Sequence, residues 1–273
     1  MERGWRLTKA SWAVIRKDPT MVSIALIGSG CALGGTAAIL LLSGYFDSPT
    51  HSRANLALAG VIALYPLTFL SVFFNVALAG AAAAHFDGRP IGVREALGIS
   101  WQRLGKIAQW ALLAAGVGLV LDQIASRIPG AGRLASWLLG GVWSLVTIFA
   151  VPILALEGRG PLDTAKESIR MIRGKWGEGI TGLVSIGAWT IFVMIPVGIL
   201  FAVGLAINDN DPNAGAALIA VAIGGLLLVS ALSLATREVF TVALYRFAKG
   251  ESVPGEFAAA DLEAPFNRRG KQD

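Results

Sequence analysis

Long apolar stretches without charged residues alternate with shorter basic segments along this chain. Residues 21–42 and 216–235, for example, contain no charged side chain. An uncharged apolar run of about 18 residues or more is long enough to cross a bilayer. Its backbone must then be helical, because lipid offers no hydrogen-bond partner to free N–H and C=O groups. The pattern therefore predicts an all-α, polytopic membrane helical bundle.

Turn residues and polar segments divide the apolar sequence into six predicted spans. We expect transmembrane helices at about 20–43, 55–84, 108–125, 134–156, 178–206 and 214–236. The second span exceeds the roughly 20 residues that a perpendicular helix needs, so we expect a tilt, a kink at Pro66 or an extension beyond the lipid. Pro196 predicts a kink in the fifth span. The helical pattern of the sixth span continues past Arg237 to Ala248.

Lysine and arginine residues are unevenly divided between alternate connections, and this division predicts the orientation of the chain. The N-terminal segment holds five, residues 85–107 hold four, residues 157–177 hold five and the region after residue 236 holds six, which leaves three of the 23 for the other connections. Cytoplasmic loops carry the excess of basic residues. We therefore expect a plasma-membrane protein with both termini cytoplasmic. Residues 1–250 would form a single transmembrane domain, and residues 251–273 a polar cytoplasmic tail.

Composition supports a membrane protein and changes the meaning of the positive charge. Only 15% of the residues are charged, whereas soluble domains carry about 25%. The formal net charge of +5 then follows from topology, so no nucleic-acid partner is expected. One cysteine and two separated histidines do not predict a metal site, and no cofactor is expected. The spans contain no HExxH motif, P-loop or serine–histidine pair, so no catalytic residue is assigned and an enzyme is not expected.

A short motif recurs at the ends of the second, fourth and sixth spans. Each has a Phe-x-Val sequence followed by a Gly…Pro turn, beginning at Phe74, Phe149 and Phe240. A basic amphipathic segment precedes the first, third and fifth spans, at residues 5–17, 93–106 and 164–175. Together the two patterns predict a threefold internal repeat of a surface helix plus a hairpin. The alternative is that the basic segments follow from the positive-inside rule alone, and the motif from chance matches in apolar sequence.

The segment 164–175 has the pattern of a helix that lies in the membrane interface. Ala165, Ile169 and Ile172 share one face, and basic residues occupy most of the remainder. Thr164 and Glu167 fit a capping box at its start. The segment either anchors the protein at a fixed depth or binds a lipid headgroup or a partner. The candidate contacts are Glu157, Arg159, Lys166, Arg170, Arg173 and Lys175, together with Arg94, Arg103 and Lys106 from the preceding basic segment.

Two polar residues next to or within apolar sequence stand out as candidates for a specific role. Glu157 follows directly on a run of seven apolar residues, where a carboxylate is costly unless it is paired or lies at the interface. It is either held by an arginine such as Arg159 or acts as a gate or ligand residue. Asn75 lies deep in the second predicted span and is a candidate intramembrane polar site. Such amides usually form hydrogen bonds between or within helices.

Several of these positions together resemble a known group of proteins. The pattern comprises Val151-Pro152, Glu157, Ala165, Ser168 and Trp176-Gly177-Glu178, with Trp5, Lys9-Ala-Ser-Trp12 and Asp18-Pro19 near the N-terminus. It resembles an uncharacterised prokaryotic family of six-span membrane proteins, grouped only as a domain of unknown function. It is more loosely similar to the membrane domain attached to some glycerophosphodiester phosphodiesterases. The resemblance covers most of the chain, implies a helical bundle in a bacterial plasma membrane and carries over no catalytic residue.

These observations lead to two hypotheses about function. The first is a non-enzymatic integral membrane protein that acts in membrane organisation or as a partner-binding scaffold. Its expected partners are membrane lipids, particularly anionic headgroups, and a protein partner or a second copy of the chain. The alternative is a transporter or channel for a lipid or small solute. A cavity lined by Asn75 or Glu157 would favour transport, whereas a bundle centre filled by Leu, Ile and Phe would count against it.

Overall fold

The structure is a computed structural model that describes residues 2–42, 53–127, 139–144, 147–175, 181–252 and 257. For residues 2–7, 53–59, 61–62, 173–175, 181–186 and 188 it describes the backbone alone. All regular elements in the described residues are helical. Five of these helices are long and apolar enough to cross a membrane. The chain is therefore an all-α polytopic membrane protein, as the apolar pattern predicts.

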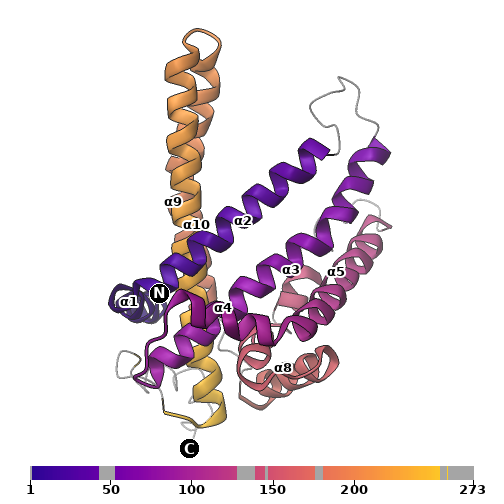
Figure 1. The fold of residues 1–273 in the computed structure, drawn as a ribbon, viewed down its shortest axis with the longest axis vertical. Coiled ribbons are helices and arrows are strands. Elements are labelled where there is room, and N and C mark those ends of the chain that lie inside the picture. Colours follow the sequence, from indigo (N-terminus) through magenta and orange to yellow (C-terminus); the bar gives the residue numbers. More distant parts are fainter. Residues whose placement is uncertain are drawn as a thin grey trace, which may run out of the picture.

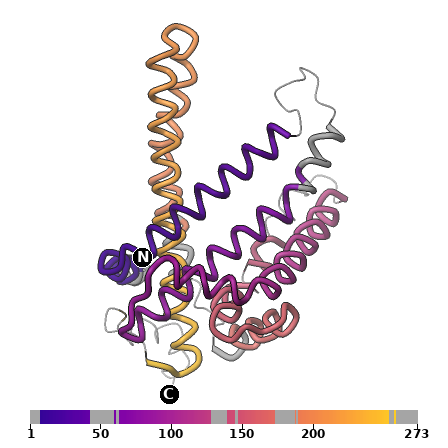
Figure 2. Tube along the Cα trace, in the orientation of Figure 1, coloured from indigo at the N-terminus to yellow at the C-terminus, as the bar shows by residue number. Residues whose placement is uncertain are grey.

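The described helices follow the predicted order of surface segments and spans (Figure 1 and Figure 2). In chain order they are α1 (Glu2–Lys17), α2 (Pro19–Leu42), α3 (Arg53–Phe86), α4 (Val93–Gln102), α5 (Leu104–Ser126), α7 (Ala150–Pro152), the π-helix η1 (Ile153–Glu157), α8 (Pro161–Lys175), α9 (Thr181–Asn208) and α10 (Pro212–Lys249). Residues 139–144 are also helical. The apolar helices α2, α3, α5, α9 and α10 correspond to five of the six predicted spans.

The predicted fourth span, residues 134–156, lies partly outside the described residues. Its described part contains the helical residues 139–144 and a turn at residues 147–149, which leads into α7 and η1. Residues 134–138 and 145–146 are not described. The described C-terminal end of this segment is therefore a turn and two short helical elements rather than one straight helix.

The long helices α3 and α10 extend beyond the thickness of a bilayer core. Pro66 lies inside α3 and Pro196 inside α9, and both helices continue through these residues. The 38 residues of α10 rise by about 57 Å at roughly 1.5 Å per residue, whereas the hydrocarbon core is about 30 Å thick. The prediction that this helix continues past Arg237 is confirmed. Its last turns can therefore carry polar partners outside the lipid.

Two arms of apolar helices diverge from a common base (Figure 1). We call α9 and α10 the hairpin arm, and α2, α3 and α5 the three-helix arm. The base consists of α1, α4, η1 and α8 with the last turns of α3 and α10, and both ends of the drawn chain lie there. Its core contains fully buried large side chains, among them Leu78, Ile153, Leu154, Phe149 and Phe240. The arms expose large apolar side chains instead, including Leu41, Ile195 and Ile199, as lipid-facing helices do.

Three glycines mark equivalent ends in the predicted repeat. Gly88 follows α3, Gly158 follows η1 and Gly250 follows α10, with φ of 71°, 60° and 77°. They are the glycines with such left-handed φ among the described residues, and this conformation ends a helix at low cost only for glycine. The three motif residues Phe74, Phe149 and Phe240 are also all buried. The order of elements and their shared ends therefore support the threefold repeat, although the two arms are not arranged symmetrically.

Candidate functional site

A sharp reversal of the chain builds the main polar cluster of the base. The amide of Gly158 donates to the carbonyl of Ile153 at 3.0 Å, which closes η1. Gly158 then turns the backbone with a left-handed φ. Pro161 begins α8, where its fixed φ suits the first helical position and its missing N–H is not needed. The turn brings the end of η1, the start of α8 and the end of α10 together.

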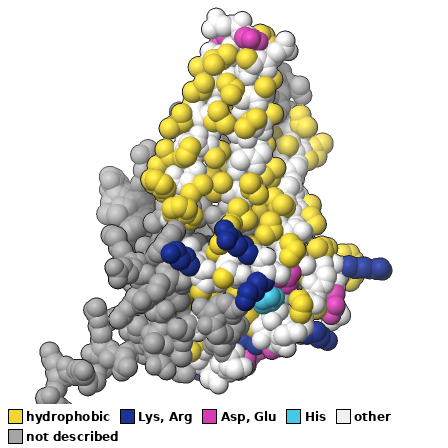
Figure 3. All heavy atoms as spheres, turned by 90° about the vertical axis from the view of Figure 1, so that its left-hand side faces the viewer, with side chains coloured by type: hydrophobic (Ala, Val, Ile, Leu, Met, Phe, Trp, Pro, Cys, Tyr) yellow, Lys and Arg dark blue, Asp and Glu magenta, His cyan; other side chains and the backbone are white. Residues whose placement is uncertain are grey.

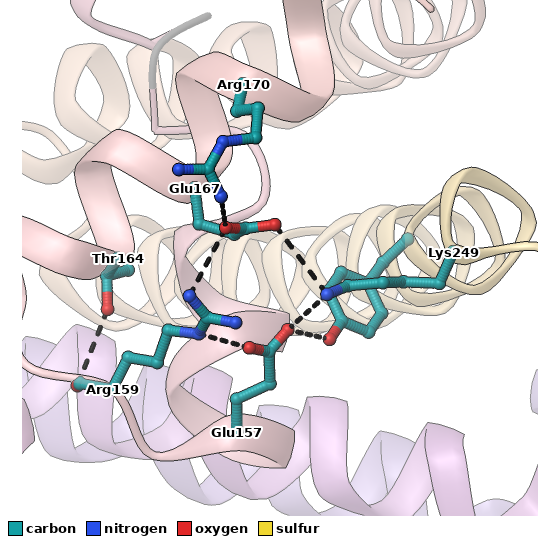
Figure 4. A network of polar contacts seen from close by, with 7 residues as sticks. Glu157, Arg159, Thr164, Glu167, Arg170 and Lys249 are labelled. Atoms are coloured by element: carbon teal, nitrogen blue, oxygen red, sulfur yellow. Dashed lines mark hydrogen bonds and ion pairs between the residues drawn. The ribbon is translucent and has the colours of Figure 1, made fainter. Parts of the chain in front are cut away.

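At the end of η1, both oxygens of the Glu157 carboxylate have polar partners (Figure 4). One oxygen accepts a hydrogen bond from Nε of Arg159 and the other from the hydroxyl of Tyr245. Nζ of Lys249 lies 3.0 Å from Oε1. Burial raises the pKa of this carboxyl, but the hydrogen bonds from Tyr245, Lys249 and Arg159 outweigh it and hold the pKa below its ordinary value. Glu157 is therefore an ionised, paired group at neutral pH.

Glu167 on α8 shares the cations of Glu157 and closes the network. Nη1 of Arg159 lies 3.2 Å from Oε2 of Glu167, and Nη1 of Arg170 lies 2.5 Å from the same oxygen. Nζ of Lys249 lies 3.7 Å from Oε1. Arg159 and Lys249 therefore bridge both carboxylates, and Figure 4 shows the closed arrangement. Two negative and three positive side chains fix α8 against the end of α10.

The predicted capping box at Thr164 and Glu167 is wrong. The helix begins three residues earlier, at Pro161, so Thr164 is already inside it. The hydroxyl of Thr164 donates to the carbonyl of Arg159 at 3.5 Å, while the Glu167 carboxylate faces the cations. Proline at the first helical position and a partly buried ion-pair network together replace the local cap.

The other predicted contact residues differ in how they lie relative to the network. Arg103 lies at the network's edge, because a Cβ added to Gly158 would lie 1.9 Å from its Nη1. Lys166 is exposed on α8 and lines, with Arg159, Asp163, Glu167 and Arg170, an open concavity of about 340 Å³. Arg94 and Lys106 are exposed and form no hydrogen bond or ion pair with described members of the network. The side chains of Arg173 and Lys175 lie outside the described residues.

Asn75 and Glu238 are polar side chains within the packed helices. Asn75 on α3 is half-buried, and its Oδ1 is buried without a hydrogen-bond partner among the described residues. Sequence reasoning missed Glu238 on α10, which is 5% exposed and whose Oε2 also has no described partner. The sequence feature that could have identified Glu238 is a carboxylate within a helical pattern that continues past the predicted membrane boundary. Neither side chain lines the three concavities of about 340, 430 and 830 Å³ in the described part of the chain.

A second polar cluster, also missed in the sequence, joins the ends of α3 and α10. The buried Arg246 donates from Nη1 to Oδ1 of Asp87 at 2.8 Å and from Nη2 to the carbonyl of Ala83 at 3.0 Å. The hydrogen bond from Arg246 lowers the pKa of Asp87. Nearby, Nδ1 of His85 lies 3.4 Å from Oδ2 of Asp18 at the α1–α2 junction. This cluster ties the first repeat unit to the third.

The two clusters share a position in the repeat. Asp87, Glu157 and Lys249 each directly precede one of the three left-handed glycines. Glu157 pairs with Lys249 itself, and Asp87 pairs with Arg246 one turn earlier in α10. The charges at the ends of the three units therefore converge on the last turns of α10. A search for charged residues immediately before a Gly…Pro turn would have found all three positions.

Comparison with known proteins identifies a family without an assigned activity. Residues 56–255 match the model of a family described as "Family of unknown function (DUF6159)". This match confirms the expected resemblance to an uncharacterised family. No curated protein matches the chain. The matched residues include those members of both polar clusters that lie on α3 or later in the chain. The family model therefore covers the ion-pair network that holds η1, α8 and the end of α10 together, which we call the joint.

Proposed function

Since the chain belongs to the family of unknown function DUF6159, we propose its role from its geometry: a non-enzymatic integral membrane scaffold whose charged base binds a partner at the membrane surface. The observation that carries this proposal is the sharing of Arg159 and Lys249 between Glu157 and Glu167. Both carboxylates are held by cations from fixed elements. The cluster therefore suits a structural joint better than proton transfer or nucleophilic attack.

The joint presents α8 as a fixed outer surface. Ser168 adds to it, because its Oγ accepts a hydrogen bond from the amide of Phe149 at 3.3 Å. The outward side of the helix carries the exposed cations Lys166 and Arg170 beside the open concavity. Exposed cations attract acidic side chains by about 0.2–1 kcal/mol per pair. We propose that this surface faces the cytoplasm of a bacterial cell and binds an acidic segment of a partner protein.

The packed core of the base favours the scaffold over the transport alternative. The fully buried Phe149, Phe240, Leu78 and Leu244 fill the region where the ends of the repeat units meet. Aromatic and aliphatic packing of this kind provides neither polar lining nor a path for a solute. Neither Asn75 nor Glu157 lines the described concavities of about 340, 430 and 830 Å³, so these three concavities do not support transport through either residue.

The scaffold is tested by cross-linking in cells with two matched lysine variants. Lys166→Glu reverses an exposed charge on α8, and Lys106→Glu reverses an exposed charge on α5, outside the network. Full-length protein is cross-linked, purified and analysed by quantitative mass spectrometry. We expect a co-purifying protein whose recovery falls at least fivefold in the Lys166 variant and is unchanged in the Lys106 variant. Equal recovery in both variants would contradict binding at α8, and substrate turnover by the purified protein would contradict a non-enzymatic role.

A further inference from the structure

A larger concavity, of about 830 Å³, lies between α1 and the hairpin arm, away from the Glu157 network. Its volume falls within the usual range of ligand sites, about 300–1,000 Å³. One wall belongs to α1 and the others to α9 and α10. The two kinds of wall differ in chemistry, and the difference indicates the class of ligand.

The wall formed by α1 is cationic. Lys9, Arg16 and Lys17 line the concavity and are exposed. Lys9 and Arg16 are seven residues apart, which places them on one face of α1 about 10 Å apart along its axis. The guanidinium of Arg16 lies 5.5 Å from the ring centre of Trp12, so this side chain is held over an aromatic ring of the same helix. No carboxylate is among the described lining residues, in contrast to the α8 concavity, which contains Asp163 and Glu167.

The wall formed by the hairpin arm is mainly apolar. Trp189, Val193, Val229 and Leu232 line it, and the hydroxyl of Thr190 is occupied by a hydrogen bond to Ser233 Oγ at 2.9 Å. Beyond the concavity, the apolar surface continues along α9 through the exposed Phe192 and Ile199, three and ten residues after Trp189. Figure 3 shows a mainly apolar column above a zone where lysine and arginine side chains gather, together with acidic side chains and a histidine.

We propose that this concavity binds one anionic phospholipid, with its headgroup between Lys9, Arg16 and Lys17 and an acyl chain along α9. A neutral lipid would bring no net negative charge to the cationic wall. A soluble phosphate would use only the cationic wall and leave the apolar wall without a ligand. An anionic phospholipid matches both walls in the order in which a bilayer presents headgroup and chain. The site lies apart from the α8 surface and does not depend on the scaffold role.

The test measures lipid retained by the purified full-length protein with native mass spectrometry. The protein in neutral detergent is titrated with phosphatidylglycerol, phosphatidylcholine or glycerol 3-phosphate. We expect one bound phosphatidylglycerol, with at least tenfold higher affinity than phosphatidylcholine, and no bound glycerol 3-phosphate.

Two pairs of variants assign this binding to the concavity. Val229→Trp fills it, whereas Leu228→Trp changes the neighbouring position, which does not line it and is exposed. We expect at least a tenfold loss of affinity in the first and no change in the second. Arg16→Gln should lower the preference for phosphatidylglycerol at least threefold, whereas Lys106→Gln should not.

Three results would overturn the proposal. They are equal affinity for the two phospholipids, equal effects of the two tryptophan variants, and glycerol 3-phosphate binding as strong as that of phosphatidylglycerol. The last result would assign the cations to a soluble phosphate. Should Val229→Trp fail to fold, the surface variant Arg16→Gln decides alone, and an unchanged phosphatidylglycerol preference in it rejects the site.

Discussion

Glu157 illustrates at the residue scale how an apolar stretch ends in a charged group without a large penalty. The side chain is 19% exposed and would be costly there as an isolated carboxylate. Arg159, Tyr245 and Lys249 all interact with it. Removing one partner of such a set leaves the others partly buried and unpaired, which costs more than the pairing itself contributes. The expected pairing with Arg159 is confirmed, and Tyr245 and Lys249 come from a distant helix.

The first prediction concerns the loss of this carboxylate. Glu157→Gln should lower the free energy of unfolding by about 1–3 kcal/mol, less than for a fully buried pair because the site is partly exposed. Glu95→Gln is the matched control, since Glu95 is 59% exposed and 3.9 Å from Arg89, and its cost should stay below about 0.5 kcal/mol. Thermal and chemical unfolding in detergent measure both. Equal free energies of unfolding for the two variants would show that the network does not hold α8 against the end of α10.

The second prediction is the pH dependence that follows from the lowered pKa values of Glu157 and Asp87. A carboxyl whose pKa is lower in the folded state stabilises the protein above its unfolded pKa, and this contribution is lost as pH falls through the folded pKa. The ordinary values are 4.5 and 3.8. The melting temperature should therefore change little between about pH 6 and 7, where the stabilising contribution of both carboxyls is fully present, and should fall on acidification below about pH 4.5.

The Glu157→Gln variant isolates one of the two groups in the same titration. Its melting temperature should fall less steeply with acidification than that of the unmodified protein, because the amide introduced in place of the carboxyl does not titrate. Parallel curves would assign the acid sensitivity to other groups. The Glu95→Gln variant should follow the curve of the unmodified protein throughout.

At the element scale, Gly158 controls how η1 turns into α8. Its φ of 60° is left-handed, and the guanidinium of Arg103 occupies the space where a Cβ would stand. Backbone conformation and packing therefore both require glycine here. The turn also decides where α8 begins, which is why the local capping signal at Thr164 was misleading. The start of α8 is therefore determined by the turn at Gly158 and the ion-pair network, not by a capping signal within the helix itself.

The third prediction separates these two requirements for glycine. Gly158→Ala should destabilise the protein by about 1–2 kcal/mol for the left-handed backbone, with a further loss from displacing Arg103. Gly160→Ala is the control, since no described atom would lie within 4 Å of its Cβ and its φ is not left-handed. Adding Arg103→Ala to Gly158→Ala should add less destabilisation than Arg103→Ala does alone, because the two side chains compete for the same space. Strict additivity would exclude contact between them.

On the scale of the whole molecule, the base is packed and charged while the arms are apolar and exposed. Only 6% of the residues in an apolar stretch of α9 within Trp189–Asn208 are buried in the protein, so the surface of this stretch needs lipid or another covering. The charged clusters gather at the base, where both ends of the drawn chain lie (Figure 1). This polarity fits a molecule whose arms enter the bilayer from one side. The sidedness itself rests on the distribution of lysine and arginine.

The fourth prediction tests that sidedness. In a Cys31→Ser background, Lys166→Cys on α8 should react with a membrane-impermeant maleimide in inverted vesicles and not in intact cells, because the distribution of lysine and arginine predicts that the base faces the cytoplasm. Asn210→Cys, in the turn between α9 and α10, should show the reverse. Gel shifts after labelling measure both. Labelling of both cysteines from the same side would reject the predicted orientation.

The sequence by itself determined the membrane class, most helix boundaries and the ends of the repeat units. These features depend on local quantities, namely the length of apolar runs, helical periodicity and the glycine that a left-handed turn requires. They also sufficed to single out Glu157, because an ionised group beside an apolar run is costly without a partner, but they left open whether it is held by an arginine or acts as a gate or ligand residue.

Only the tertiary structure decided which groups meet. Tyr245 lies 88 residues after Glu157, and Arg246 lies 159 residues after Asp87. The same charges could pair differently in another packing of the same helices, because an ion pair depends on the distance between side chains and not on their order in the chain. The concavity beside α1 depends likewise on three helices from opposite ends of the sequence. Helix packing therefore determines both the polar joint and the amphipathic cavity.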